Sequence, residues 1–367
     1  MKRIDVFLRT TSQAYHAYPD NKDQISHVIN TLTKRVFTEE GKLCDVPYFP
    51  GNGLRGRFRR VAGKVVMDHL IKSEGGYIPE KLYLGLMSGS SVNQPDGASN
   101  SIAEIFAVHE DAYMGLFGGG ARMLESGYRV SDINPVLAST VSAGLVPDGV
   151  FRVPTTGKDN RECTTAWDVT ELVTQIHCND ILDPCDDPAG ALRYVSEDDV
   201  QEHYRLVGEE RGSDSKHHNI KNMMAYRVIA TGVPFHFSIT IADHVTNAQV
   251  GLLIECLKDF VQSGSGLGGM GRAGWGCFKV HSVTLSDNGE KYSLYDEGGA
   301  SVDSKTAELL ETFSEAMKKS ISEMTLAKTA GFFENRDPDK TPEGRAEKAA
   351  KKAETAAAKA AAKKQEA

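Results

Sequence analysis

One stretch constrains the fold more than any other part of the chain. It runs from Pro47 to Lys64 and reads Pro-Tyr-Phe-Pro-Gly-Asn-Gly-Leu-Arg-Gly-Arg-Phe-Arg-Arg-Val-Ala-Gly-Lys. Its two prolines and its Gly-Asn-Gly step end any preceding element and allow a tight backbone turn. Apolar residues then recur at helical spacing, which predicts a helix over about 54–71 with one buried face. We expect Asn52 to cap this helix, since asparagine is preferred at helix starts.

Basic side chains gather at the start of this predicted helix. Its first two turns carry Arg55, Arg57, Arg59 and Arg60. Unpaired N–H groups at a helix start attract anions, and a guanidinium fork matches two phosphate oxygens. The four arginines, with Asn52 and Gly53, are therefore predicted to hold a phosphodiester backbone. The alternative is a solvated basic helix end that binds nothing.

A second glycine-rich stretch, residues 264–276, places seven glycines around Arg272 and Trp275. Such a loop lets a nucleic-acid backbone pass close to the main chain. Trp275 either stacks on a base or belongs to the core, and both remain open. The stretch also matches the Gly-x-Gly-x-x-Gly dinucleotide pattern, but here a helix precedes it and a strand follows, the reverse of that fingerprint. We therefore expect no cofactor. The predicted RNA contacts in the loop are Gly268, Gly269, Met270, Arg272 and Trp275.

Three motifs in a fixed order resemble the RAMP superfamily of CRISPR proteins. The first is the Pro-Gly-x-x-Leu-x-Gly-x-x-Arg pattern of residues 50–59. The second is Leu-Phe-Gly at 116–118, followed by Gly-Tyr-Arg-Val-Ser-Asp at 127–132, and the third is the late glycine loop. Within the superfamily, the chain is most similar to the repeated backbone subunit of type IV systems.

This resemblance implies a function in antiviral or anti-plasmid interference. Such a subunit binds CRISPR guide RNA, polymerises along it and presents it for base pairing with target nucleic acid, with DNA favoured. Its expected partners are the guide RNA, the target, other copies of itself and other effector subunits. Side-by-side copies on one RNA would form a helical filament through a non-closing head-to-tail contact.

The order of predicted elements indicates an α+β fold. Alternating apolar patterns predict strands near 4–8, 128–131, 145–153, 235–241 and from 278 onward. A capping box at Thr246–Gln249 begins a second helix, which ends at Gly264. Strand, helix, strands, insertion, strand, helix, strand is the order of a ferredoxin-like (RRM-type) core with large insertions. We assign this core to residues 1–154 and 223–300.

The remaining segments differ in composition. Residues 155–222 are charged and rich in turn formers, and the resemblance implies a thumb-like β-hairpin there; a loop without a partner is the alternative. Residues 301–336 hold an amphipathic helix at about 304–328. Residues 337–367 form an Ala/Lys-rich tail without an apolar stripe, expected to be disordered or a frayed helix.

The competing function is an RNA endonuclease of the same superfamily. It would cut target RNA with an aspartate of the loop after the first strand, Asp20 or Asp23. That loop lacks the compact Gly-rich approach of the nuclease relatives, and nothing fixes two carboxylates on one metal. We therefore expect no catalytic activity. A stand-alone RRM-like RNA chaperone is a third possibility, but it would not need the large insertion.

Cysteine usage, hydropathy and charge limit the other classes. The six cysteines lack paired spacing, and the cluster of Cys163, His177, Cys178 and Cys185 contains no Cys-x-x-Cys pair, so no metal site is expected. No apolar run reaches the roughly 18–20 residues that span a bilayer, so a cytoplasmic protein without membrane contact is expected. The net charge of −8 does not favour nucleic acid, but phosphate contacts are local and a basic patch suffices.

Overall fold

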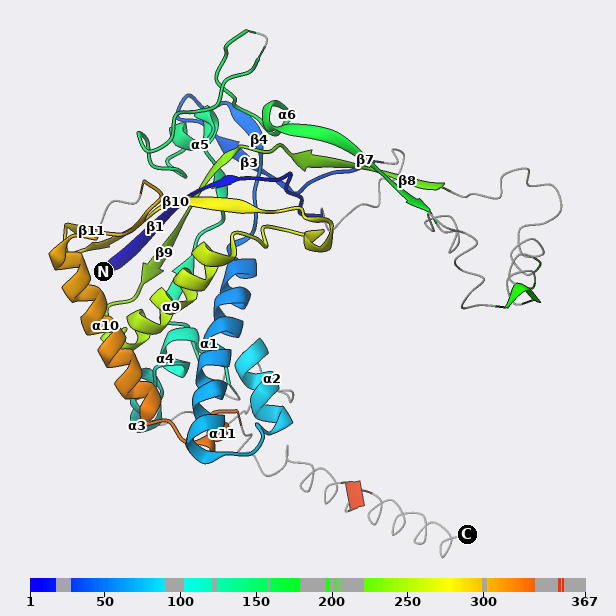
Figure 1. Ribbon diagram of the computed structural model, residues 1–367. Coiled ribbons are helices and arrows are strands. Elements are labelled where there is room, and N and C mark those ends of the chain that lie inside the picture. Colours follow the sequence, from blue (N-terminus) through cyan, green and yellow to red (C-terminus); the bar gives the residue numbers. More distant parts are fainter. Residues whose placement is uncertain are drawn as a thin grey trace, which may run out of the picture.

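The central feature is an antiparallel sheet with the strand order β11–β10–β1–β9–β5 (Figure 1). The computed structural model describes residues 1–17, 28–89, 102–120, 124–157, 159–178, 196–198, 202, 205, 221–298, 302–333, 349–350 and 352. The strands of this sheet are β1 (Lys2–Thr10), β5 (Tyr128–Val130), β9 (Pro234–Ile241), β10 (Phe278–Asp287) and β11 (Glu290–Asp296), with β6 (Asn134–Pro135) also pairing with β9.

Two long helices cover one face of this sheet. Helix α1 (Gly51–Glu74) lies between β1 and β5 in the chain, and α9 (Asn247–Ser263) connects β9 to β10 (Figure 1). The chain order β1, α1, β5, β9, α9, β10, with β1 and β9 central, is the ferredoxin-like arrangement. The predicted α+β fold class is confirmed.

Further elements surround this core. The helices are α2 (Glu80–Ser88), α3 (Ile102–Glu110), α4 (Met114–Phe117), α5 (Ala138–Ser142), α6 (Ala166–Val169), the 3-10 turn η1 (Gly271–Ala273), α10 (Ser304–Ser322) and α11 (Leu326–Gly331). The strands β3 (Thr33–Phe37) and β4 (Leu43–Pro47) pair with each other, and β2 (Val28–Ile29) pairs with β8 (Lys221–Ile229). Among the residues that the structure describes, no helix is long and apolar enough to cross a membrane.

Local sequence signals explain strand β1 and helix α9. The alternation along β1 buries Ile4, Val6 and Leu8 against the helices. Helix α9 begins with the predicted capping box, in which the Gln249 N–H donates to the Thr246 hydroxyl and the Thr246 N–H donates to the Gln249 side chain. It ends at Gly264, whose φ of 55° lies in the left-handed region.

The second face of the sheet is also covered, by α5 and the segment after it. Phe7 of β1 packs with Val136, Val146 and Phe151. The strand expected at 145–153 is wrong, because these residues form turns and coil. Their apolar side chains pack onto Phe7 and cover it. Gly149 has a φ of 88°, which is incompatible with the extended conformation of a strand.

A β-ribbon projects from the core (Figure 1). It consists of β7 (Thr170–Cys178) and β8 (Lys221–Ile229), paired antiparallel from Thr170 with Ile229 to Cys178 with Lys221. These strands are the two arms of the expected hairpin, and the returning arm continues past residue 222 to Ile229. The expected hairpin tip and nearly all of the 337–367 tail lie outside the described residues.

The predicted C-terminal helix is divided in two. Helix α10 ends at Ser322, and α11 begins after Thr325, whose hydroxyl accepts a hydrogen bond from the Lys328 N–H. This cap starts a new helix, so the apolar periodicity that suggested one helix over 304–328 spans two.

Candidate nucleic-acid interface

Helix α1 begins about three residues earlier than the sequence predicted. Its first residue is Gly51, preceded by Pro50, and Asn52 lies exposed in the first turn instead of capping it. The early start is possible because Gly51 has no Cβ: one placed there would lie 2.5 Å from the Ser131 carbonyl oxygen of the segment after β5. The expectation that Asn52 caps the helix is therefore wrong.

The anion at the start of α1 is a carboxylate of the protein itself. The Gly51 N–H donates to Asp132 Oδ1 at 3.4 Å, and Lys34 Nζ donates to Asp132 Oδ2 at 2.8 Å. Lys34 also lies 4.8 Å from the centroid of the Tyr48 ring. Sequence reasoning noticed Asp132 only as part of a motif, because no local pattern pairs it with a helix about 80 residues earlier.

Two of the four arginines are used inside the protein. Arg59 Nη2 donates to the Phe117 carbonyl at 2.6 Å and its Nη1 to the Gly118 carbonyl at 3.2 Å, at the end of α4. Arg57 donates to the Ser265 carbonyl and the Ser263 hydroxyl, and its Nη2 lies 3.3 Å from an oxygen of Asp259. Arg59 thus fixes α1 to α4, and Arg57 fixes it to the end of α9 and the start of the glycine loop.

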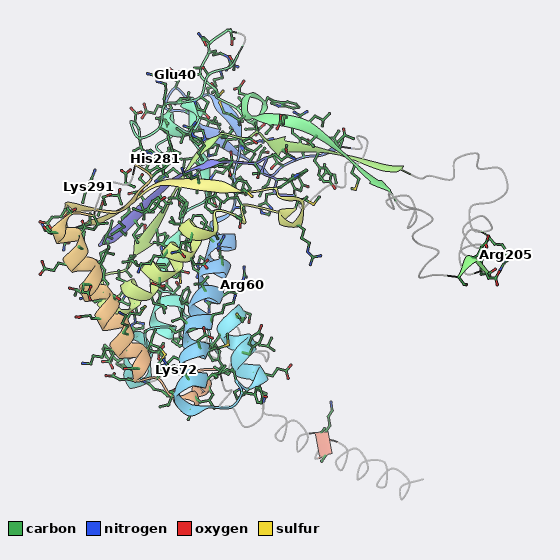
Figure 2. The ribbon with its side chains drawn as sticks, in the orientation of Figure 1. Glu40, Arg60, Lys72, Arg205, His281 and Lys291 are labelled. Carbon is green, nitrogen blue, oxygen red and sulfur yellow. The ribbon has the colours of Figure 1, made fainter. Side chains whose placement is uncertain are left out.

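The other two arginines differ in exposure. Arg55 is half-buried, with its guanidinium 5.9 Å from the centroid of the Tyr128 ring. Burial raises the pKa of Tyr128 above its ordinary value, and the nearby Arg55 and Arg59 charges only partly offset this. Arg60 is exposed on α1 (Figure 2), and no hydrogen bond or ion pair joins it to the described part of the chain. Of the four, Arg60 is therefore the one most available to an external anion.

The backbone of the glycine loop is held by Tyr15, while other residues of the loop are exposed. Gly268 pairs with Tyr15 in a β-bridge, and the Gly269 N–H donates to the Tyr15 carbonyl at 2.7 Å. Met270 adopts a left-handed conformation with φ of 60°, which is uncommon for a residue other than glycine. Arg272 lies exposed on η1 and forms no ion pair or hydrogen bond with the described residues.

Trp275 belongs to the interior. Its side chain is only 4% exposed and packs edge-on against Tyr226 and Tyr15, with ring centroids 5.6 and 6.2 Å away. Burial, with Tyr226 beside it, raises the pKa of Tyr15 to about 12, so this phenol is neutral in the cluster. Of the two alternatives that the sequence left open, the structure supports the core position, and no base can reach this indole.

The glycines of α1 and of the glycine loop fall into two groups: some are required by a close contact within the described chain, and others are not. A Cβ on Gly268 would lie 2.0 Å from the Tyr15 carbonyl oxygen, and one on Gly276 2.1 Å from that of Leu267. In contrast, Gly53 and Gly271 have open space around the position of a Cβ and do not have a positive φ. Glycine in a helix costs up to about 1 kcal/mol relative to alanine. These two positions keep the main chain bare where something outside the described residues could approach it.

The face on which an RRM stacks bases is closed in this protein. RRM domains bind RNA with aromatic side chains of the central strands. The corresponding rings here are Phe7 on β1, which is 5% exposed, and His236 on β9, which is 1% exposed. Their ring centroids lie 4.6 Å apart. Asp5 Oδ1 lies 2.9 Å from His236 Nε2. Binding in the manner of a simple RRM chaperone is therefore not available to this sheet.

Only some residues of the nuclease alternative lie within the described part of the chain. Asp20 and Asp23 lie outside the described residues. His16 is half-buried, its ring stacks on Phe49 with centroids 6.4 Å apart, and burial lowers its pKa. The part of the chain that the structure describes holds no group of three metal-ligating side chains.

Fold and surface together define an α+β protein of ferredoxin-like topology with an exposed surface of glycine and arginine. No protein-family model matches the sequence, and no curated protein matches it. Among solved structures, the chain is similar to a chain of a "Type IV-B CRISPR Complex", with a TM-score of 0.46 and 15% sequence identity. The match covers 82% of this chain and 100% of that chain. A likeness of this size does not establish a shared family.

Proposed function

We propose that this protein is a guide-RNA-binding backbone subunit of a type IV CRISPR effector complex. Three lines of support converge on it. The ordered motifs of residues 47–280 resemble that subunit, the core has the ferredoxin-like topology that the resemblance implies, and a β-ribbon projects where a thumb-like hairpin is expected.

One observation carries the proposal: the glycine–arginine surface. We define it as Asn52, Gly53 and Arg60 of α1 together with Gly269, Gly271 and Arg272 of the glycine loop, all exposed. The helix is joined to the start of the loop by Arg57, which donates to the Ser265 carbonyl. Bare main chain with unpaired guanidinium groups suits a phosphodiester backbone, whose oxygens match the arginine fork.

This surface is suited to hold RNA regardless of sequence. It offers no ordered set of side chains for reading base edges, which is what a guide-holding protein needs, since the guide itself reads the target by base pairing. Copies bound side by side would make a head-to-tail contact that does not close, and the ribbon would reach a neighbouring copy. In this proposal the subunit is not an enzyme, and the target, with DNA favoured, is contacted through the guide.

The test compares exposed arginines on and off the glycine–arginine surface. Arg60→Ala with Arg272→Ala should weaken binding of all RNA sequences. It should also reduce the slope of log affinity against log salt by about 0.7 per lost contact, or about 1.4 in total. The control is Arg129→Ala on β5, an exposed arginine paired with Glu125. Unchanged affinity and slope in the double variant would refute the proposal.

Assembly and cleavage provide the second measurement. Particle mass should increase in regular steps with guide length, as seen by mass photometry. Matched target RNA, incubated with the assembled complex and Mg²⁺ or Mn²⁺, should remain intact. Regular cuts that disappear in Asp20→Ala or Asp23→Ala would instead establish the endonuclease.

A further inference from the structure

An exposed tryptophan at the root of the ribbon is stacked on an arginine. Trp167 lies on α6, just before β7, and its side chain is 68% exposed. The guanidinium carbon of Arg227, on β8, lies 3.9 Å from the centroid of the Trp167 ring. The exposed fraction is large for a tryptophan. Burying the ring would contribute favourable free energy to folding, and the protein forgoes that contribution by keeping the ring accessible.

The guanidinium group of Arg227 is held in place but lacks acceptors. Its Nε is buried without a hydrogen-bond partner, and no ion pair or hydrogen bond joins the group to the described residues. Arg227 pairs across the ribbon with Leu172, whose side chain is 55% exposed. The indole, the guanidinium and this leucine therefore make a platform with a flat apolar part and unused donors.

The platform is separate from the glycine–arginine surface. Side chains alternate along a strand, so Arg227 points away from its neighbours Tyr226 and Val228. Those two pack in the aromatic cluster with Tyr15 and Trp275, beneath the glycine loop. In Figure 1, α6 lies above β7, and the turn that contains η1 lies below the ribbon.

We propose that Trp167 and Arg227 form a binding site for one unpaired nucleotide of a single-stranded nucleic acid. The base stacks on the exposed indole face, and the guanidinium donates to a phosphate or to the edge of the base. Aromatic stacking accepts any base, and a cation beside the ring adds a phosphate contact. Every nucleotide carries a flat base and an anionic phosphate side by side, whereas a protein partner would have to place an apolar side chain and a carboxylate at the same spacing, so the observations favour the nucleotide.

This inference rests on the proposed function, since it adds a second contact to a protein that binds nucleic acid. The bound nucleotide can come from the guide or from an unpaired target strand, which share the same chemistry. Both sources are tested by loading the full-length protein with guide RNA alone and then adding the target strand.

Tryptophan fluorescence reports the site directly, because the chain has only two tryptophans. Trp275 is buried and Trp167 is exposed, so stacking should quench the exposed component. We expect quenching on adding unstructured oligo(A) RNA, and its loss in Trp167→Phe, whose remaining emission comes from Trp275. Quenching with guide alone assigns the nucleotide to the guide, and quenching only after target addition assigns it to the target.

Affinity measurements complete the test. Trp167→Ala should weaken RNA binding about 5- to 150-fold without changing its salt slope, corresponding to stacking of about 1–3 kcal/mol. Trp167→Phe should lose less than Trp167→Ala, and Arg227→Ala should reduce the salt slope by about 0.7. The control is Tyr77→Ala, which removes a 96% exposed ring on which no cation of the described residues is stacked.

The outcomes separate this site from the glycine–arginine surface. RNA binding that depends on Arg60 and Arg272, without quenching and with Trp167→Ala unchanged, would overturn the inference and leave the proposed function standing. Loss of particle assembly in Trp167→Ala, with single-copy RNA affinity unchanged, would identify a protein contact and also overturn it. Absence of all RNA binding would overturn both.

Discussion

Neighbouring arginines of α1 should respond to mutation in opposite ways. Arg59 donates two hydrogen bonds to the Phe117 and Gly118 carbonyls, at 2.6 and 3.2 Å, while exposed Arg60 has no partner among the described residues. A hydrogen bond to a charged group contributes about 1.5–3 kcal/mol, and losing it leaves a partly buried carbonyl unsatisfied. Because the two bonds share one guanidinium, we expect Arg59→Ala to lower the free energy of unfolding by about 2–4 kcal/mol.

Arg60→Ala should change that free energy by less than about 0.5 kcal/mol, as is usual for an exposed position. Urea denaturation measures both values, and RNA affinity against salt is measured on the same samples where they are fully folded. Arg59→Ala should keep the wild-type salt slope, and Arg60→Ala should lose about 0.7 of it. A stable Arg59→Ala protein with a reduced slope would refute this reasoning and make Arg59 a phosphate contact. Arg59→Lys serves as a further control, because a lysine keeps the charge without the two-pronged fork.

Two further predictions concern the sheet and the glycines. Burial raises the pKa of Asp5, but the hydrogen bonds with His236 and Arg3 outweigh it and hold the pKa below its usual value. The stability from Asp5 is therefore complete above the ordinary aspartate pKa of about 3.9 and is lost as pH falls through the lowered value, so Asp5→Asn should be less stable at neutral pH and less sensitive to acid in denaturation curves. Gly53→Ala should raise the free energy of unfolding by about 0.5–1 kcal/mol yet weaken RNA binding, because only an outside ligand needs that space. Gly268→Ala should destabilise the protein, since φ is 77° and its Cβ would meet the Tyr15 carbonyl; equal stability of the two variants would contradict this pair.

The elements that sequence analysis predicted well are those with strong local periodicity. Helix α9 has a capping box, an apolar face and a terminal glycine, all within residues 246–264. The alternation of β1 and β9 likewise depends only on neighbouring residues. The segment at 145–153 has comparable apolar content, but its side chains pack onto Phe7, a contact that no local pattern encodes.

The candidate site was harder to predict because its members have distant partners. The sequence alone does not distinguish the four arginines of α1. They differ in the structure through partners such as Ser265, Phe117 and Gly118, which lie 58–208 residues away. The position of each arginine around the helix does predict part of this difference. Arg60 lies two residues from buried Phe58, about 200° around the helix, and therefore faces away from that buried side chain. The Asp132 contact at the helix start and the burial of Trp275 likewise depend on tertiary packing.

The aromatic cluster beneath the glycine loop makes the ribbon and the loop one mechanical unit. Trp275 belongs to the loop, Tyr226 belongs to β8, and Tyr15 forms the β-bridge with Gly268. The three rings pack as a cluster separate from the main core. Close-packed side chains transmit displacement instead of absorbing it, so a shift of the loop on contact with a ligand moves the root of the ribbon with it. Because β7 and β8 extend away from this cluster, we expect a small rotation at the root to displace the distant ends of the two strands further than the root itself.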